Sequence, residues 1–286
     1  MEIRRVVPSG YCKGVVNAIK LAKDTKLKYP NEKIYVLGMI VHNSYVTKEL
    51  DNLGIITLDD TNKSKSDLID EVNEGIIIFT AHGISDELKQ KVINKGLKYV
   101  DATCVDVLKT KETIINYLNL GYDVIYFGKK NHPEADAIIS INNKIHLVSN
   151  ENDISELNIN NELIFMTNQT TMSYLELNKL IQIAKNKYPT LIIEEEICNA
   201  TSSRQLAISN LENCDLLYVV GDVKSNNTNK LVEIGIKKGI KTVKLIPSYK
   251  QIEDLDLIDV NNICVTAGTS TPPQLIDEVI NYLKNK

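Results

Sequence analysis

Three of the five cysteines in this 286-residue chain recur at a nearly constant spacing. Cys12, Cys104 and Cys198 lie 92 and 94 residues apart, close to a third of the chain length. A strand-like apolar run precedes each of them and a helix-like pattern follows, as expected for an internally repeated unit. The spacing therefore predicts three similar α/β units.

Each third of the chain carries three further apolar runs that predict strands. These runs are 35–37, 55–58 and 76–79, then 124–127, 145–148 and 163–166, then 217–220, 242–245 and 264–266. Apolar strands that alternate with helices predict parallel sheets covered on both faces, with ligands at the carboxyl ends of the strands. We expect an α/β fold of three such units in a pseudo-threefold, or trefoil, arrangement.

The expected units are residues 13–103, 104–197 and 198–286. The strand before each cysteine either opens its own unit or belongs to the preceding sheet. In the second case residues 1–12 complete the third unit, and the sequence is compatible with both arrangements.

Charge and hydropathy argue against two classes of partner. The chain has 33 Lys plus Arg against 37 Asp plus Glu and no basic tract, so we expect no nucleic-acid partner. No run approaches the 18 or so apolar residues of a membrane span, and the first residues lack the apolar stretch of a secretory signal. An odd number of cysteines without close pairs fits a reducing compartment, which predicts a cytoplasmic protein.

The repeated cysteines predict a metal centre. A helix amino terminus favours the thiolate that metals require, whereas the unmatched Cys214 and Cys264 are expected to pack as small buried residues. Zinc usually takes Cys-x-x-Cys pairs, which are absent, while three separated thiolates suit an iron-sulfur cluster. A 4Fe-4S cluster on three cysteines keeps one open iron, which can act as a Lewis acid.

Polar residues at the predicted strand ends are candidates for a binding site. His42, His82 and His132 all occupy such positions, and Ser225–Asn229 offers hydroxyl, amide and backbone donors suited to phosphate oxygens. The alternative for that segment is an ordinary helix cap. Glu134 is the candidate proton donor because it stands beside His132, and the alternative is a solvated loop acid.

Short motifs mark the strand ends along nearly the whole chain. They are Gly10-Tyr11-Cys12-Lys13-Gly14-Val15, Val41-His42-Asn43, Ala81-His82-Gly83-Ile84-Ser85, Asp101-Ala102-Thr103-Cys104, His132-Pro133-Glu134, Gln169-Thr170-Thr171, Cys198-Asn199-Ala200-Thr201 with Arg204-Gln205, Asn227-Thr228-Asn229 and Thr266-Ala267-Gly268-Thr269-Ser270. In this order the set resembles the 4-hydroxy-3-methylbut-2-enyl diphosphate reductases, the IspH/LytB family.

The resemblance implies a trefoil around a central 4Fe-4S cluster ligated by Cys12, Cys104 and Cys198. It implies a two-electron reductive dehydroxylation that yields isopentenyl and dimethylallyl diphosphates, the last step of the non-mevalonate pathway. Because no Gly-x-Gly-x-x-Gly nucleotide fingerprint is present, the electrons are expected from a ferredoxin or a flavodoxin.

The resemblance also assigns the substrate contacts. Glu134 and Thr170 relay the proton, and His132 lies with them at the hydroxyl end. The diphosphate contacts are His42, His82, Ser225, Asn226, Asn227 and Ser270.

Four residues depart from the usual pattern of the family, which has serine, glycine, proline and threonine where Asn226, Ala137, Val105 and Asn168 stand. None of the four is a cluster ligand or the acid. The alternatives to the reductase are another three-cysteine cluster enzyme such as quinolinate synthase, a non-catalytic cluster-binding protein and a metal-free ligand-binding module. A dicarboxylate site of the quinolinate synthase kind would be expected to carry more arginine.

Overall fold

The structure is a computed structural model that describes residues 1–286. Its strands form three four-stranded parallel sheets connected by helices, which confirms the expected α/β fold. The chain divides into two compact units. We call residues Asn17–Val41 and Thr47–Cys198 the central unit, and Met1–Val16, His42–Val46 and Asn199–Lys286 the terminal unit. The three domain boundaries expected from the repeat stay a prediction.

The central unit contains two of the sheets. The first has the order β3-β2-β4-β5 and the second the order β7-β6-β8-β9. Their strands are β2 Ile34–Leu37, β3 Ile55–Leu58, β4 Ile76–Phe79, β5 Lys98–Asp101, β6 Asp123–Phe127, β7 Ile145–Val148, β8 Ile164–Asn168 and β9 Ile192–Ile193. Their helices are α3 Lys65–Asp70, α4 Asp86–Asn94, α5 Val105–Asn119, α6 Pro133–Ile139, α7 Glu151–Glu156 and α8 Tyr174–Lys187. Helices α1, Lys13–Lys28, and α2, Ser44–Asn52, each begin in the terminal unit and continue in the central unit.

The terminal unit contains the third sheet, in the order β1-β12-β10-β11. Its strands are β1 Glu2–Arg5, β10 Leu216–Val220, β11 Thr242–Ile246 and β12 Asn262–Ala267. Its helices are α9 Asn199–Ser209, α10 Asn226–Lys237 and α11 Pro273–Lys284, with short 3-10 turns η1 Tyr249–Gln251 and η2 Asp254–Leu257.

The three sheets share one strand order. In each of them the strand that precedes a repeated cysteine, which is β5, β9 or β1, lies at one edge beside β4, β8 or β12. Strand β1 therefore pairs in parallel with β12 although about 260 residues separate them, with Arg4 opposite Cys264. The repeat seen in the sequence is thus also a repeat of topology.

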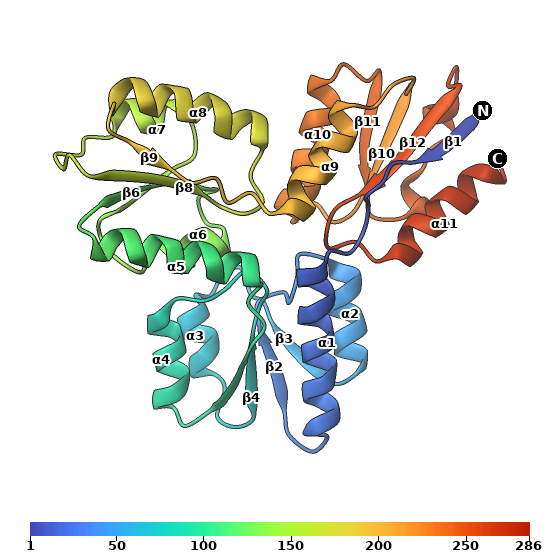
Figure 1. Ribbon diagram of the computed structural model, residues 1–286. Coiled ribbons are helices and arrows are strands. Elements are labelled where there is room, and N and C mark those ends of the chain that lie inside the picture. Colours follow the sequence, from blue (N-terminus) through green and yellow to red (C-terminus); the bar gives the residue numbers. More distant parts are fainter. The chain divides into compact units, whose positions relative to one another are not determined.

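Both faces of the second sheet are covered by helices, as Figure 1 shows for α5 and α6 on one face and α7 and α8 on the other. Alternate residues of β6 face the two layers. Val124 and Tyr126 pack with the α5 and α6 layer, whereas Ile125 and Phe127 pack with the α7 and α8 layer. This double coverage explains why the strands are continuous apolar runs.

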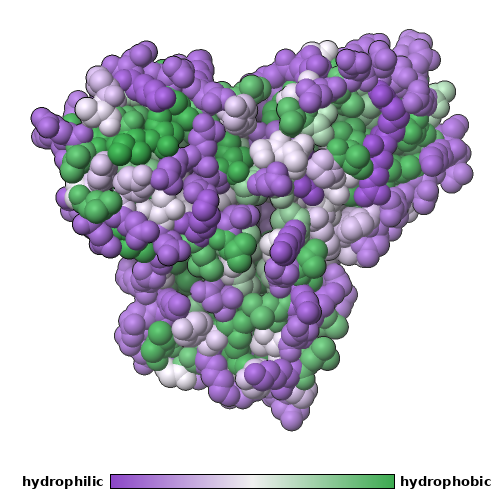
Figure 2. All heavy atoms as spheres, viewed as in Figure 1, coloured by the Kyte–Doolittle hydropathy of each residue, from purple (hydrophilic) through white to green (hydrophobic).

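No helix in the chain combines the length and the apolar character needed to span a membrane. On the face drawn in Figure 2, hydrophilic residues surround the hydrophobic ones that reach the surface. This pattern agrees with the 24% of charged residues in the sequence.

Candidate functional site

The backbone N–H of each repeated cysteine donates to a carbonyl in the loop that follows a neighbouring strand, which is β12, β4 or β8. The three donor–acceptor pairs are Cys12 N–H to Thr269 C=O (3.1 Å), Cys104 to Ala81 (3.0 Å) and Cys198 to Thr170 (3.1 Å). The loops follow β12, β4 and β8 and carry Ser270, His82 and Thr170. Each cysteine therefore lies beside a polar residue that the sequence assigned to the site.

The repeated cysteines all stand at helix amino termini. Cys104 caps α5, and Cys12 and Cys198 directly precede α1 and α9. All three are half-buried and form no disulfide, and the backbone N–H of Val15 points at the Cys12 sulfur at 3.5 Å. Helix amino termini favour thiolates, so this placement suits metal ligation.

Glu134 is a buried carboxylate held by Thr170. It lies in the first turn of α6 and is 1% exposed. The Thr170 backbone N–H donates to one carboxylate oxygen at 2.8 Å, and the Thr170 hydroxyl donates to the other at 3.0 Å. The alternative of a solvated loop acid is therefore wrong.

The environment of Glu134 raises its pKa to about 7. Burial is the main cause, because it disfavours the charged form. The two hydrogen bonds from Thr170 and the buried phenol of Tyr126 lower the pKa and offset part of this effect. The carboxyl can therefore hold and release a proton near neutral pH.

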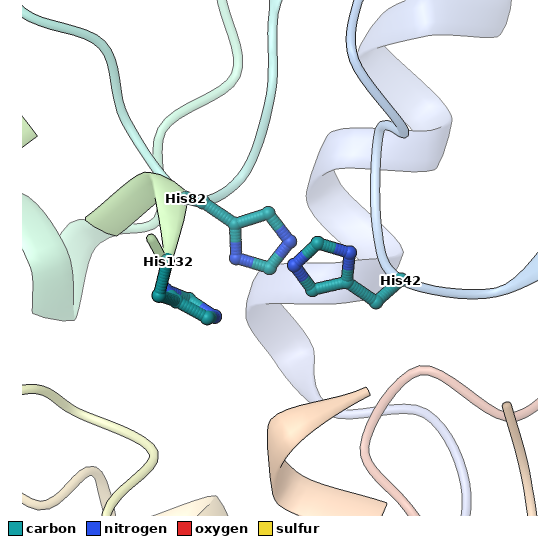
Figure 3. Close-up of side chains that lie close together, drawn as sticks. All are labelled: His42, His82 and His132. Atoms are coloured by element: carbon teal, nitrogen blue, oxygen red, sulfur yellow. The ribbon is translucent and has the colours of Figure 1, made fainter. Parts of the chain in front are cut away.

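His132 and His82 lie next to each other in the central unit. His132 caps α6, where its Nδ1 accepts from the Glu134 N–H at 3.2 Å. The ring of His82 meets that of His132 edge to face, with centroids 5.4 Å apart (Figure 3). Gly83 follows His82 with a φ of +87°, a conformation that favours glycine, and closes a turn through its N–H to Thr80.

The third predicted histidine, His42, belongs to a short segment of the terminal unit. Its carbonyl accepts from the Ser270 hydroxyl at 3.0 Å. The next residue but one, Ser44, donates its N–H at 2.9 Å and its hydroxyl at 2.5 Å to the carboxylate of Asp222. Asp222 thus fixes the backbone that carries His42, and the sequence analysis did not identify it.

Ser225 caps α10 by accepting from the Thr228 N–H at 3.3 Å, and Asn226 and Asn227 occupy the first turn in buried positions. The side-chain oxygen and nitrogen of Asn227 are buried without a hydrogen-bond partner. A Cβ on Gly268 would lie 2.1 Å from the Thr228 hydroxyl, so glycine allows the loop after β12 to approach this turn. The cap expected as an alternative is present, together with an amide that still needs a partner.

Arg204 is a second positioning residue that the sequence analysis quoted without giving it a role. It is 5% exposed in α9 and donates to the carbonyls of Ala200 at 2.6 Å and Gly10 at 2.7 Å. The second bond fixes the loop that leads to Cys12. The signal available in the sequence was an arginine six residues after a candidate ligand.

The structure shows where the four residues that depart from the family pattern lie. Asn168 ends β8, and its side chain accepts from the Glu196 N–H at 3.0 Å, so it braces the segment before Cys198. Ala137 is buried in α6, and Val105 is 68% exposed at the start of α5. Asn226 is buried in the first turn of α10.

Comparisons with known proteins agree over the whole chain. A family model described as LytB protein matches residues 3–284. The 4-hydroxy-3-methylbut-2-enyl diphosphate reductase of Bacillus pumilus is 42% identical over 288 residues, which cover 100% of this chain and 91% of that protein. The reductase of the same name from Bacillus subtilis is 42% identical over 287 residues, or 99% and 91% of the two chains.

Two solved structures are also similar. The E-1-hydroxy-2-methyl-but-2-enyl-4-diphosphate reductase of Plasmodium falciparum matches with a TM-score of 0.91 and 34% identity, over 99% of this chain and 88% of that one. A second structure, described as (E)-4-hydroxy-3-methyl-but-2-enyl diphosphate reductase, the terminal enzyme of the non-mevalonate pathway, has a TM-score of 0.69 and 29% identity over 99% of both chains.

Proposed function

This chain belongs to the LytB family, and on that premise we propose how its residues carry out the reaction of the family. The enzyme is an iron-sulfur oxidoreductase. It removes the hydroxyl group of 4-hydroxy-3-methylbut-2-enyl diphosphate and forms isopentenyl and dimethylallyl diphosphates, in the terminal step of the non-mevalonate pathway. The relatives favour this activity over that of a quinolinate synthase or a non-catalytic cluster protein.

Cys12, Cys104 and Cys198 are the proposed ligands of a 4Fe-4S cluster with one open iron. Their properties fit this group, because all three are half-buried, form no disulfide and stand at helix amino termini. Their N–H groups are already engaged by loop carbonyls, which fixes the backbone from which each sulfur projects. When bound, the cluster supplies electrons and a Lewis-acidic iron for the hydroxyl end of the substrate.

The diphosphate is proposed to bind neutral donors. His42, Ser225, Asn226, Asn227 and Ser270 belong to the terminal unit, and His82 belongs to the central unit. Asn227 supports this assignment, because its buried amide has no partner within the protein and its N–H₂ can donate to a phosphate oxygen. The amino terminus of the 12-residue helix α10 adds a favourable field for an anion.

Glu134 is the proposed proton donor, and its geometry is the observation that carries the mechanism. Two hydrogen bonds from Thr170 hold both carboxylate oxygens, and burial places the pKa at about 7, so a large fraction is protonated at neutral pH. The proton passes from Glu134 to the departing oxygen, with Thr170 as relay and His132 beside them.

The electrons are proposed to come from a ferredoxin or a flavodoxin in the cytoplasm. The chain has no Gly-x-Gly-x-x-Gly fingerprint for a nicotinamide or flavin nucleotide, so a separate carrier is needed. Comparing turnover with each purified carrier under anaerobic conditions identifies the one that supports the faster rate.

Glu134→Gln tests the role of the acid. The amide keeps the shape of the side chain but cannot deliver a proton, so the single-turnover rate with a chemical reductant is expected to fall by about 10² to 10⁴. Substrate affinity and the visible spectrum of the cluster should stay as in the parent protein, because the loss is confined to the transition state. A near-parental rate would assign the proton to another group.

A further inference from the structure

The third repeated cysteine, Cys198, follows a shorter strand than the other two. Strand β9 before it has two residues, whereas β5 before Cys104 and β1 before Cys12 have four residues each. Residues 194–197, which we call the ligand segment, connect β9 to Cys198. Regular strand pairing therefore ends early in this repeat, and other contacts are needed to hold the ligand segment in place.

A side chain of β8 supplies one of these contacts. Before Cys104 and Cys12, the residue two positions earlier donates its N–H to a backbone carbonyl; the pairs are Ala102 with Phe79 at 3.1 Å and Gly10 with Ala267 at 3.5 Å. Before Cys198 the corresponding residue is Glu196, and its N–H donates at 3.0 Å to the side-chain oxygen of Asn168. A carboxamide thus takes the place of a backbone carbonyl in this repeat alone.

The carboxamide of Asn168 is buried and uses both of its ends. The residue is 0% exposed, and while its oxygen accepts from Glu196, its nitrogen donates to the carbonyl of Gln169 at 3.0 Å. Because the side chain is enclosed, water does not readily replace these bonds. Loss of the carboxamide would leave the N–H of Glu196 without its acceptor.

Helix α5, which the second repeated cysteine caps, makes the other polar contacts of the ligand segment. The Tyr117 hydroxyl donates to the Glu194 carboxylate at 2.8 Å, and the Lys109 ammonium lies 3.0 Å from the Glu196 carboxylate. The ring of Tyr117 is stacked on the buried ring of Phe165, with centroids 3.7 Å apart. Lys109 is 68% exposed, so its ion pair contributes little, and Tyr117 is the better fixed of the two contacts.

We propose that Asn168 is a positioning residue for Cys198, and that the ligand segment couples the positions of Cys198 and Cys104. This inference rests on the proposed function, in which both cysteines ligate the cluster. Asn168 attaches the segment to β8, and Tyr117 attaches it to α5. A sulfur on a loosened segment leaves iron more often, so loss of either contact weakens the retention of iron.

Asn168→Leu removes both hydrogen bonds and keeps the branched shape of the side chain. In the full-length protein purified anaerobically, we expect ferrozine to remove iron about tenfold faster, as is typical when a residue that supports a metal ligand is lost. The backbone N–H of Glu196 should also exchange with deuterium about tenfold faster, because its acceptor is gone. Asn168→Ala, which removes the bonds without adding bulk, should give the same two results.

The control is Asn161→Leu, at the other end of the same sheet. The Asn161 side chain has a similar pair of bonds, since its oxygen accepts from the Leu163 N–H at 3.0 Å and its nitrogen donates to the Gly121 carbonyl at 2.8 Å. This variant should be less stable to heat but should release iron at the parental rate. Asn168→Asp keeps an acceptor oxygen, so the exchange of the Glu196 N–H should stay close to the parental rate.

Tyr117→Phe tests the coupling to α5. It removes the hydroxyl that contacts Glu194 and keeps the ring that stacks on Phe165. We expect iron removal to become about two- to fivefold faster, a smaller effect than that of Asn168→Leu because the lost bond is exposed to solvent. The control is Tyr122→Phe, because Tyr122 contacts the ring of Tyr117 and makes no hydrogen bond to the ligand segment.

The measurements separate the parts of the proposal. Equal iron removal from Asn168→Leu and Asn161→Leu, or an unchanged exchange of the Glu196 N–H, would overturn the role of Asn168. Equal iron removal from Tyr117→Phe and Tyr122→Phe would overturn the coupling. If the parent protein itself holds no iron, the proposed function fails instead, and the exchange of the Glu196 N–H still decides whether Asn168 holds the ligand segment.

Discussion

The hydrogen bond between the Thr170 hydroxyl and Glu134 can be removed without changing the shape of the site. In Thr170→Val the backbone N–H of residue 170 still donates to one carboxylate oxygen, and only the hydroxyl donor at 3.0 Å from the other oxygen is lost. The two side chains have nearly the same volume. The substitution therefore isolates one of the hydrogen bonds that lower the pKa of Glu134.

The size of the effect follows from the burial of the carboxylate. A hydrogen bond to a charged group contributes about 1.5 to 3 kcal/mol, and one pKa unit corresponds to about 1.4 kcal/mol. Since Glu134 is 1% exposed, solvent provides no replacement donor. The lost bond favoured the charged form, so its removal should raise the pKa by about one to two units above the parental value of about 7.

The assay is the pH dependence of the single-turnover rate with a chemical reductant. Glu134 acts in its protonated form, so the rate falls as the pH rises through its pKa. In Thr170→Val this fall should move to higher pH by about one to two units, whatever the rate at low pH. The control is Thr167→Val, which removes a buried hydroxyl of β8 that has no hydrogen-bond partner. An unmoved fall, or one at lower pH, would refute the reasoning.

Two further experiments, each with a matched control variant, test the proposed ligands and the support of His42. Cys104→Ser should lose most of its iron and its turnover, whereas Cys214→Ser should keep both. An iron assay and the visible spectrum of the anaerobically purified protein measure this difference. Full iron in Cys104→Ser would contradict the three-cysteine site. Asp222→Ala removes the hydrogen bonds that hold the segment of Ser44 and His42, so KM should rise roughly tenfold with little change in kcat. Asp222→Asn keeps an acceptor oxygen, so its KM should return part of the way to the parental value. A lower kcat at constant KM would mean that Asp222 acts on the chemical step.

The predictable part of the site is the part that the sheets impose. Strands buried on both faces are continuous apolar runs, so the carboxyl ends of β4 and β8 could be located from the sequence, and with them His82 and Thr170. The first strand, β1, ends at Arg5. Val6 still donates its N–H to the Val265 carbonyl, and Pro8, which has no N–H to donate, limits the pairing two residues later.

The missed residues depend on contacts between distant parts of the sequence. Tyr126 lies in a strand with apolar residues on both faces, so the pattern does not show that its phenol lies beside Glu134. Asp222 and Ser44 are 178 positions apart, and each by itself resembles an ordinary loop residue.

The pairing of β1 with β12 separates the order in which the protein is made from the order in which it can assemble. Cys12 is translated long before its partners, because the strand before it pairs with Asn262–Ala267 and its own N–H is held by Thr269. During synthesis the Cys12 thiol therefore has no fixed position until β12 is translated, whereas Cys104 and its partner Ala81 are synthesised close together in time. In the proposed site, delivery of iron and sulfide to all three cysteines consequently follows the translation of β12 and cannot guide the folding of the residues before it.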